Sequence, residues 1–306
     1  MLNTYHDVTG VEAGNAKDRL SMGYHWDKEK NSYLAIPSYA QPEGQGAGCV
    51  FSSVSDYAKW VRALLKRAGP LSEEAHKEMV SGRTIIPYEG NEALPRYGHA
   101  LYALGLQVET YRGYPLIGHD GSYSGFKASM RYLPDQDWGV VMFGNADDAY
   151  SVAQILFHQL MDGVIEVPEE DQTDWAAYWR KCWEDDKEER HKDDPDLLLS
   201  ESLEPTYVPL EELAGEYVHA GYGTLSLMFT DGKLEADCSD RGMPFKLRFD
   251  HLKEASFVVK YKHLLDGSTR KMKADFDIVE GGIVKSVGLP LCDEMKDEFI
   301  WFHKRT

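Results

Sequence analysis

At 306 residues, the chain is about twice as long as a typical ~150-residue domain, which favours two domains. Its formal net charge of −18 repels nucleic-acid phosphates and anionic lipid, so we expect neither nucleic acid nor a membrane as a partner. Its four cysteines are widely spaced, which predicts neither a zinc site nor a disulfide framework and leaves a single disulfide open. Met1 to Val8 show no secretory signal, so the compartment stays open, with the cytoplasm favoured if Met1 is the true start.

Residues 1–47 are rich in Gly, Pro, Asn and Tyr and are expected to be irregular. A helix follows, because Ser53 and Asp56 form a capping box that satisfies amides at a helix start. Gly69-Pro70 ends this helix, and residues 72–80 predict a second, shorter one. The apolar residues of the first helix recur at helical spacing: Val54, Tyr57, Trp60, Val61, Leu64 and Leu65.

The periodicity changes from helical to alternating near residue 100, which predicts strands. Residues 128–133 and 138–143 flank Pro134 to Asp137, a turn sequence between two strands. Residues 150–161 predict a helix packed on this antiparallel meander. Segregated helices and antiparallel strands indicate an α+β fold, with an antiparallel sheet flanked by helices.

An acidic stretch over residues 167–206 predicts a helical connector. Its aromatic residues and one cysteine fall on one helical face: Trp175, Tyr178, Trp179, Cys182 and Trp183. This face would either dock a partner or pack on the chain's own domain, and we favour the second interpretation.

The chain is almost wholly β after Tyr207. Turn pairs separate its short strands at Asp231-Gly232, Asp266-Gly267 and Gly281-Gly282, which predicts a small all-β barrel or sandwich. The predicted divisions are therefore residues 1–166, 167–206 and 207–306.

The segment from Gly118 to Phe126 is the strongest candidate for chemistry. Its glycines allow main-chain amides to approach a ligand, and an amide at a strand edge can face a developing oxyanion. His119 could bind a substrate carbonyl or move a proton. The alternative is a tight connection between strands in which glycine serves backbone geometry alone, and the local residues do not decide between the two.

Two blocks of the chain resemble β-lactamase-related serine hydrolases, the superfamily of class C β-lactamases, penicillin-binding proteins and esterases. Residues 47–56 (AGCVFSSVSD) resemble a helix entry of that family, and Gly118 to Phe126 resembles its His-x-Gly strand. Leu133-Pro134 and the run from Val140 to Asn145 extend the second resemblance. The likeness covers about residues 1–165 and implies part of a β-lactamase-like domain. From Leu210 the chain resembles the small lipocalin-like β-domain that follows the catalytic domain in many members, so we expect a barrel.

The resemblance implies roles for the second block. His119 would contact the substrate or a tyrosine base, Gly121 completes His-x-Gly, and the Ser122 amide would form half of an oxyanion hole. Tyr123, Ser124 and Phe126 would line the substrate site. The implied substrate is a small-molecule or peptide-like acyl compound (an ester, an amide or a β-lactam), with no cofactor and no metal.

The chain departs from the family in its nucleophile. The family uses the serine of a Ser-x-x-Lys motif with a Tyr-x-Asn motif, and no Tyr-x-Asn occurs here. Ser124 to Lys127 fits Ser-x-x-Lys by its letters, but residues three apart on a strand point to opposite faces. We therefore interpret this match as coincidence.

Met1 to Thr4 resembles the segment that follows the missing motifs, so we expect the chain to start inside a catalytic domain. One sheet edge and one apolar helix face would then be uncovered, and a homo-oligomer or a partner would cover them. Two functions remain. The chain is either a serine hydrolase that is inactive alone, or a non-catalytic, degenerate homologue that acts as a binding or scaffold protein.

Overall fold

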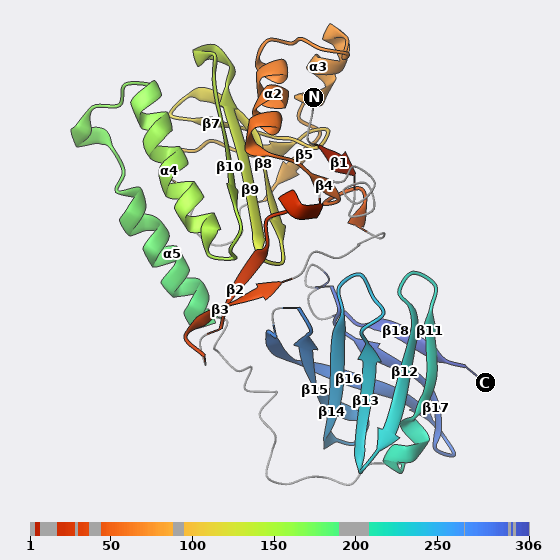
Figure 1. The fold of residues 1–306 in the computed structure, drawn as a ribbon. Helices are drawn as coiled ribbons and strands as arrows, with labels where there is room; N and C mark the ends of the chain where they lie inside the picture. Colours follow the sequence, from red (N-terminus) through yellow and green to blue (C-terminus); the bar gives the residue numbers. More distant parts are fainter. Residues whose placement is uncertain are drawn as a thin grey trace. The chain divides into compact units, whose positions relative to one another are not determined.

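The computed structural model consists of two compact units, residues 1–187 and 188–306 (Figure 1). The predicted divisions at residues 166 and 207 stay predictions. Met1 to Asn3, Asp266 and the acidic residues of 190–207 lie outside the described part of the chain. The structure describes residues 4–6, 17–27, 30–36, 44–87, 95–189, 208–265, 267–292, 295 and 298–305.

A six-stranded antiparallel sheet forms the centre of the first unit, and each strand pairs with the next along the chain. This order confirms the predicted meander. The turn between the last two strands is a 3-10 turn, Pro134–Gln136, followed by Asp137 in the left-handed conformation. The strands are β5 (Thr84–Ile86), β6 (Ala100–Tyr102), β7 (Gln107–Tyr111), β8 (Tyr114–Tyr123), β9 (Phe126–Leu133) and β10 (Trp138–Gly144).

Helices cover both faces of this sheet (Figure 1). On one face, α2 (Val54–Leu65) packs Val61 and Leu64 against the sheet, and on the other α4 (Ala149–Val164) packs Phe157 and Met161. The Ser53 side chain accepts a hydrogen bond from the Asp56 amide and caps α2, as predicted. The predicted helices at 72–80 and 150–161 are also present, as α3 (Glu73–Met79) and α4.

The described residues within 1–47 are less irregular than expected. Strands β2 (Gly23–Asp27) and β3 (Ser32–Ile36) form a hairpin, and β1 (Tyr5–His6) pairs with β4 (Val50–Phe51). Strands of two to five residues are too short to give a readable alternation, and the β2–β3 turn uses Asn31 with a positive φ of 49°. A 3-10 turn, Lys17–Arg19, precedes β2.

The second unit is a closed eight-stranded antiparallel barrel, which decides between the predicted barrel and sandwich. Asp231 and Gly232 both have a positive φ, as a tight hairpin turn requires. Large side chains such as Tyr217, Phe257 and Phe302 fill the interior. Its likeness to lipocalins stays a prediction. A 3-10 turn (Leu210–Leu213) precedes β11 (Gly215–His219), β12 (Gly223–Thr230), β13 (Lys233–Cys238), β14 (Phe245–Lys253), β15 (Ser256–His263), β16 (Thr269–Val279), β17 (Ile283–Leu289) and β18 (Ile300–Lys304).

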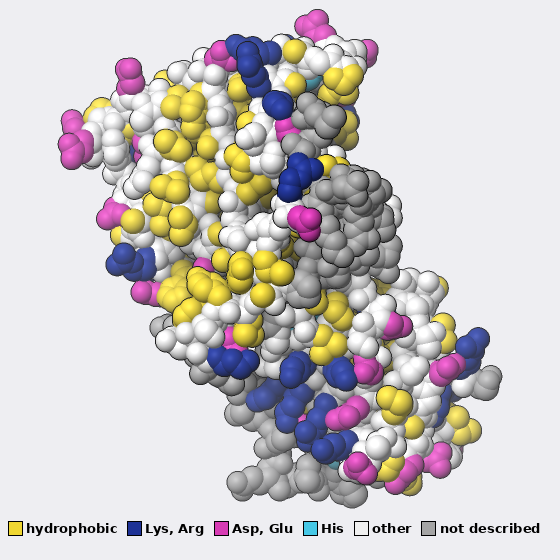
Figure 2. Space-filling model, in the orientation of Figure 1, with side chains coloured by type: hydrophobic (Ala, Val, Ile, Leu, Met, Phe, Trp, Pro, Cys, Tyr) yellow, Lys and Arg dark blue, Asp and Glu magenta, His cyan; other side chains and the backbone are white. Residues whose placement is uncertain are grey.

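Exposed apolar side chains gather on one side of the first unit (Figure 2). They include Phe143 of β10 and Val152, Leu156 and Leu160 of α4. None of the described helices in the chain is long and apolar enough to cross a membrane. All four cysteines lie in the described part of the chain and form no disulfide there, so the disulfide left open by the sequence is not formed.

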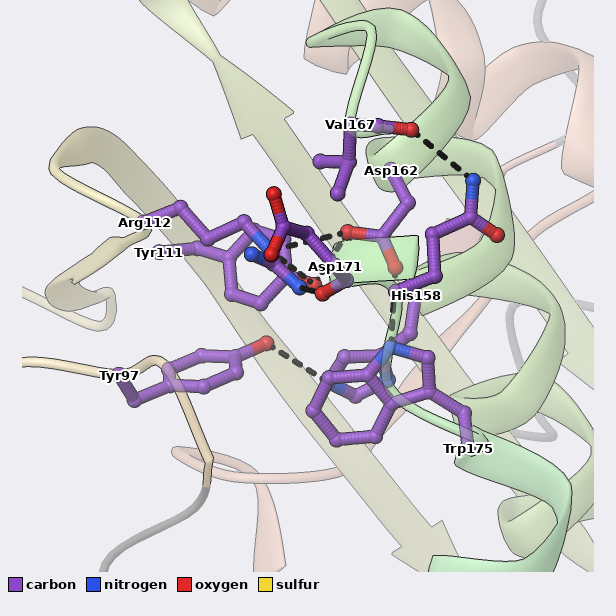
Figure 3. Close-up of polar contacts among 9 residues, drawn as sticks. Tyr97, Tyr111, Arg112, His158, Asp162, Val167, Asp171 and Trp175 are labelled. Carbon is purple, nitrogen blue, oxygen red and sulfur yellow. Dashed lines mark hydrogen bonds and ion pairs between the residues drawn. The ribbon is translucent and has the colours of Figure 1, made fainter. Parts of the chain in front are cut away.

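Buried polar contacts attach α5 (Trp175–Glu189) to the first unit (Figure 3). The Asp162 carboxylate accepts hydrogen bonds from the Tyr111 hydroxyl at 2.5 Å and the Trp175 indole at 3.1 Å, and Arg112 lies 3.3 Å away. Trp175 is only 1% exposed. The start of this helix therefore packs on its own domain, which is the interpretation favoured from the sequence.

His158 of α4 lies in this network as a neutral imidazole. Its Nδ1 donates to the Gln154 carbonyl at 2.6 Å. Its Nε2 accepts from the Tyr97 hydroxyl at 2.9 Å, and its ring stacks on Trp175 (Figure 3). Burial lowers the pKa of His158 from 6.5 to about 4. Between about pH 4 and pH 6.5, the His158 side chain is therefore protonated in the unfolded chain and neutral in the folded chain.

This difference in proton uptake predicts acid sensitivity. Between pH 7 and pH 5 the first unit should lose about 2 kcal/mol of stability through His158 alone, because stability rises with pH between the folded and unfolded pKa values. Urea unfolding of the wild type and His158→Gln at both pH values measures this difference. The loss of unfolding free energy between pH 7 and pH 5 should be about 2 kcal/mol smaller in His158→Gln than in the wild type. Equal losses in both proteins would contradict the lowered pKa of His158.

Candidate active site

Strand β8 has an open edge along the segment that the sequence analysis singled out. It pairs with β9 as far as Tyr123, but β7 accompanies it only up to the Gln107–Gly118 pair. Among the described residues, no other strand pairs with β8 beyond Gly118. The last residues of β8 therefore have a strand neighbour on one side only.

The register shows which amides face this open edge. Alternate residues of an antiparallel strand exchange their hydrogen bonds with opposite neighbours. Tyr123 and Phe126 close the two-residue turn to β9, so His119 and Gly121 also pair toward β9. Asp120 and Ser122 then direct their N–H and C=O groups away from β9, into the open edge. The Ser122 amide therefore faces the open edge, and its role as an oxyanion donor stays a prediction.

An ion pair between a buried arginine and a partly exposed aspartate supports this segment. Arg131 of β9 binds both carboxylate oxygens of Asp120, at 3.0 and 2.7 Å, and its side chain is only 6% exposed. Position 118 requires glycine, because a Cβ there would lie 2.2 Å from the Met130 carbonyl oxygen and 2.5 Å from the Arg131 side chain. Burial raises the pKa of the neighbouring Glu109 carboxyl, and burial together with Asp120 raises that of Tyr150 to about 12.

His119 lies at the open edge and contacts a tyrosine. Its Nδ1 lies 2.5 Å from the Asp120 carbonyl, and its Nε2 lies 3.0 Å from the Tyr102 hydroxyl. Because a carbonyl only accepts, Nδ1 carries the proton and the neutral ring accepts from Tyr102 through Nε2. The pair can pass a proton between a phenol and an imidazole. Tyr102 lies at the end of β6 and belongs to no Tyr-x-Asn motif, so the sequence held no signal for it.

The Ser122 side chain points to the face of the sheet opposite His119, because the two residues are three positions apart on a strand. Its hydroxyl accepts a hydrogen bond from the Lys127 ammonium at 2.6 Å. Lys127 lies 3.7 Å from the Asp147 carboxylate, which also binds His25 at 3.0 Å. Lys127 therefore contacts its cross-strand neighbour Ser122, a contact that sequence reasoning missed.

The turn after β8 is covered by the β2–β3 hairpin. Gly125 has a φ of 76°, and a Cβ on it would lie 2.7 Å from the Tyr24 amide nitrogen. A Cβ on Gly23 would lie 2.6 Å from the Phe126 ring. Phe126 and Ser124 are partly buried here, as is Tyr123 at the end of β8. The substrate-binding role predicted for these three residues stays a prediction.

A second Ser-x-x-Lys sequence, Ser268 to Lys271, runs into strand β16 of the barrel. Neither this match nor Ser124 to Lys127 starts a helix, so neither places its lysine one turn above its serine. Within the described residues, no serine at the start of a helix is followed by a lysine three residues later, which is the setting of the family's nucleophile.

Comparison with known protein families shows to which family the first unit is related. The profile of the family described as Beta-lactamase matches residues 6–162, which is half of the chain. The chain belongs to the beta-lactamase family. The barrel, over residues 202–304, matches a family described as a domain of unknown function, DUF3471.

Two curated relatives of this beta-lactamase-family chain are fungal hydrolases. The unguisins hydrolase of Aspergillus campestris is 28% identical over 313 residues, which cover 99% of this chain and 57% of the relative. That of Aspergillus violaceofuscus is 28% identical over 315 residues, covering 94% of this chain and 54% of the relative. The chain therefore spans a little over half the length of the curated relatives it matches.

Solved structures with some likeness include two proteins of related description. The octameric penicillin-binding protein homologue of Pyrococcus abyssi has a TM-score of 0.44 and 20% identity, covering 99% of this chain and 57% of that one. A D-stereospecific amidohydrolase from Streptomyces has a TM-score of 0.33 and 23% identity, covering 42% and 35%. Scores of this size do not establish a shared fold over the whole chain.

Proposed function

We propose that the first unit is the oxyanion-stabilising wall of a serine hydrolase that acts on an ester, an amide or a β-lactam. The observation that carries this proposal is the open edge of β8, where the Ser122 amide has no strand partner among the described residues. Membership of the beta-lactamase family and the hydrolase names of the curated relatives support it.

In the proposed reaction, a hydroxyl attacks the substrate carbonyl and the carbonyl oxygen becomes an oxyanion. The Ser122 N–H donates to that oxygen, and a fixed amide is effective because it needs no reorganisation as the charge develops. His119 and Tyr102 form a hydrogen-bonded pair that can take up the proton of the hydroxyl and return it to the leaving group.

We propose that the attacking hydroxyl belongs to a Ser-x-x-Lys segment outside these 306 residues. Ser122 is a poor candidate, because Lys127 donates a hydrogen bond to it and pairs with Asp147. A general base must instead present a free electron pair to the hydroxyl. This chain alone would then be inactive.

A second candidate function is a binding or scaffold protein without catalysis. The missing Tyr-x-Asn motif and the missing helix-start Ser-x-x-Lys favour it. In that case the open edge of β8 would bind an extended acyl or peptide-like ligand through its main chain, without covalent chemistry.

Acylation of the native protein separates these functions. We would purify the protein from its source cells, treat it with a fluorophosphonate probe and locate the adduct by mass spectrometry. The proposal predicts an adduct on the serine of a Ser-x-x-Lys segment outside residues 1–306, on the same polypeptide or on one that copurifies. Absence of any adduct would favour the binding protein, and an adduct on Ser122 or Ser124 would refute the assignment of the nucleophile.

The oxyanion role of the Ser122 amide is tested by two substitutions in the active preparation. Ser122→Pro removes the N–H from the open edge without removing a bond to β9, and should lower kcat by about 10²–10³-fold. Ser122→Ala keeps the amide and should stay within a few-fold of wild type. Equal losses of kcat in both variants would show that the Ser122 hydroxyl, and not its amide, contributes to catalysis. Circular dichroism checks that both variants fold.

A further inference from the structure

Lysine and arginine side chains gather on one face of the barrel (Figure 2). Three neighbouring strands, β14, β15 and β16, each carry two of them at alternate positions, which point to the same face of a strand. All six are exposed, whereas Leu247 and Met272, which alternate with them, are buried in the barrel core. The six cations form what we call the basic face: Lys246, Arg248, Lys260, Lys262, Lys271 and Lys273.

The strand register places several of these cations directly opposite one another. Lys246 lies opposite Lys262. Lys260 lies between two cations, with Arg248 opposite it on one side and Lys271 on the other. Like charges directly opposite each other on a sheet are destabilising, so this arrangement costs the barrel stability.

Carboxylates on and beside the face offset only part of this repulsion. Asp250 lies 3.1 Å from Arg248 and 2.8 Å from Lys260. Three further carboxylates lie opposite or beside the other cations: Glu235, Asp237 and Asp275. Six cations therefore meet four carboxylates, and Lys262 forms no ion pair within the described residues.

Protection against aggregation does not explain these lysines. Proteins place lysine on edge strands to prevent pairing with other chains. The barrel is closed, and β14, β15 and β16 each have a strand neighbour on both sides. Residues that cost stability and guard no edge are expected where binding requires them.

The charge of the whole chain narrows the choice of partner. A net charge of −18 repels a long polyanion, such as nucleic acid or an anionic bilayer. A short segment in contact with the basic face meets the local positive charge, because charges beyond about 8 Å are largely screened at physiological salt. Alternate side chains on a strand are about 6.8 Å apart, and those of an extended peptide have the same spacing.

We infer that the basic face of the barrel binds an extended, acidic peptide segment of another protein. Carboxylates at every second position of that segment lie over the paired cations of a strand. Binding offsets the repulsion between Lys246 and Lys262, and it supplies Lys262 with a carboxylate. This face lies wholly within the second unit, so its binding does not depend on the chemistry proposed for β8.

Fluorescence anisotropy with the 306-residue chain tests this binding. The probe is a short labelled peptide in which aspartate and serine alternate, and its affinity should fall as added salt screens the contact. The same peptide with asparagine in place of aspartate should not bind. Lys262→Thr combined with Lys271→Thr should weaken binding about tenfold, since each exposed charge contributes modestly.

A matched control removes two exposed lysines outside the basic face. Lys77→Gln in α3 combined with Lys285→Thr in β17 should leave the affinity unchanged. Equal losses in the two double variants, or no binding of the aspartate peptide to the wild type, would overturn the inference. Tighter binding of single-stranded DNA of the same charge would assign the face to nucleic acid and would overturn it as well.

Thermal unfolding gives an independent test of why Lys262 is present. Lys262→Thr removes the repulsion with Lys246 and places a β-branched residue in the strand. The variant should therefore unfold at a higher temperature than the wild type while binding the peptide more weakly. A lower unfolding temperature would show that Lys262 stabilises the barrel itself, and would overturn the inference.

Discussion

The candidate site of the first unit depends on Gly118, the residue at which strand β8 loses its pairing with β7. Up to that residue β8 has neighbours on both sides, and beyond it only β9 remains. A buried strand end could not leave main-chain groups unpaired without a large cost, so this end must face solvent or a ligand. Strand β7 does not extend beside β8 past Gly118. The Tyr102 side chain of β6, the next strand in the sheet, therefore reaches His119 across the space that β7 leaves.

The Asp120–Arg131 pair makes this edge rigid. Arg131 is buried with a carboxylate on both of its terminal nitrogens, so removing either partner would leave an unpaired charge. The strand therefore cannot twist to redirect its amides without breaking the pair. Asp147 adds a second constraint, since it accepts from the Gly125 amide and binds His25 of the β2–β3 hairpin. Both contacts hold the edge in the conformation that the proposed chemistry needs.

Local patterns in the sequence predicted the elements well, because their signals lie within a few residues. The Ser53 cap, the helical spacing after it and the turn at Pro134 to Asp137 are examples. Contacts set by strand register were not predictable in the same way. Lys127 meets Ser122, and Tyr102 meets His119, only because non-local pairing fixes which residues face each other. The short β2–β3 hairpin was missed because it has no period to read.

The central claim is that the Ser122 amide is available to a ligand while its neighbours are not. Amide hydrogen exchange followed residue by residue by NMR measures this directly. The account predicts fast exchange at Ser122 and Asp120, and slow exchange at His119 and Gly121, whose N–H groups bond to β9. Protection at Ser122 equal to that at Gly121 would show that another part of the chain already occupies this edge, and would contradict the account.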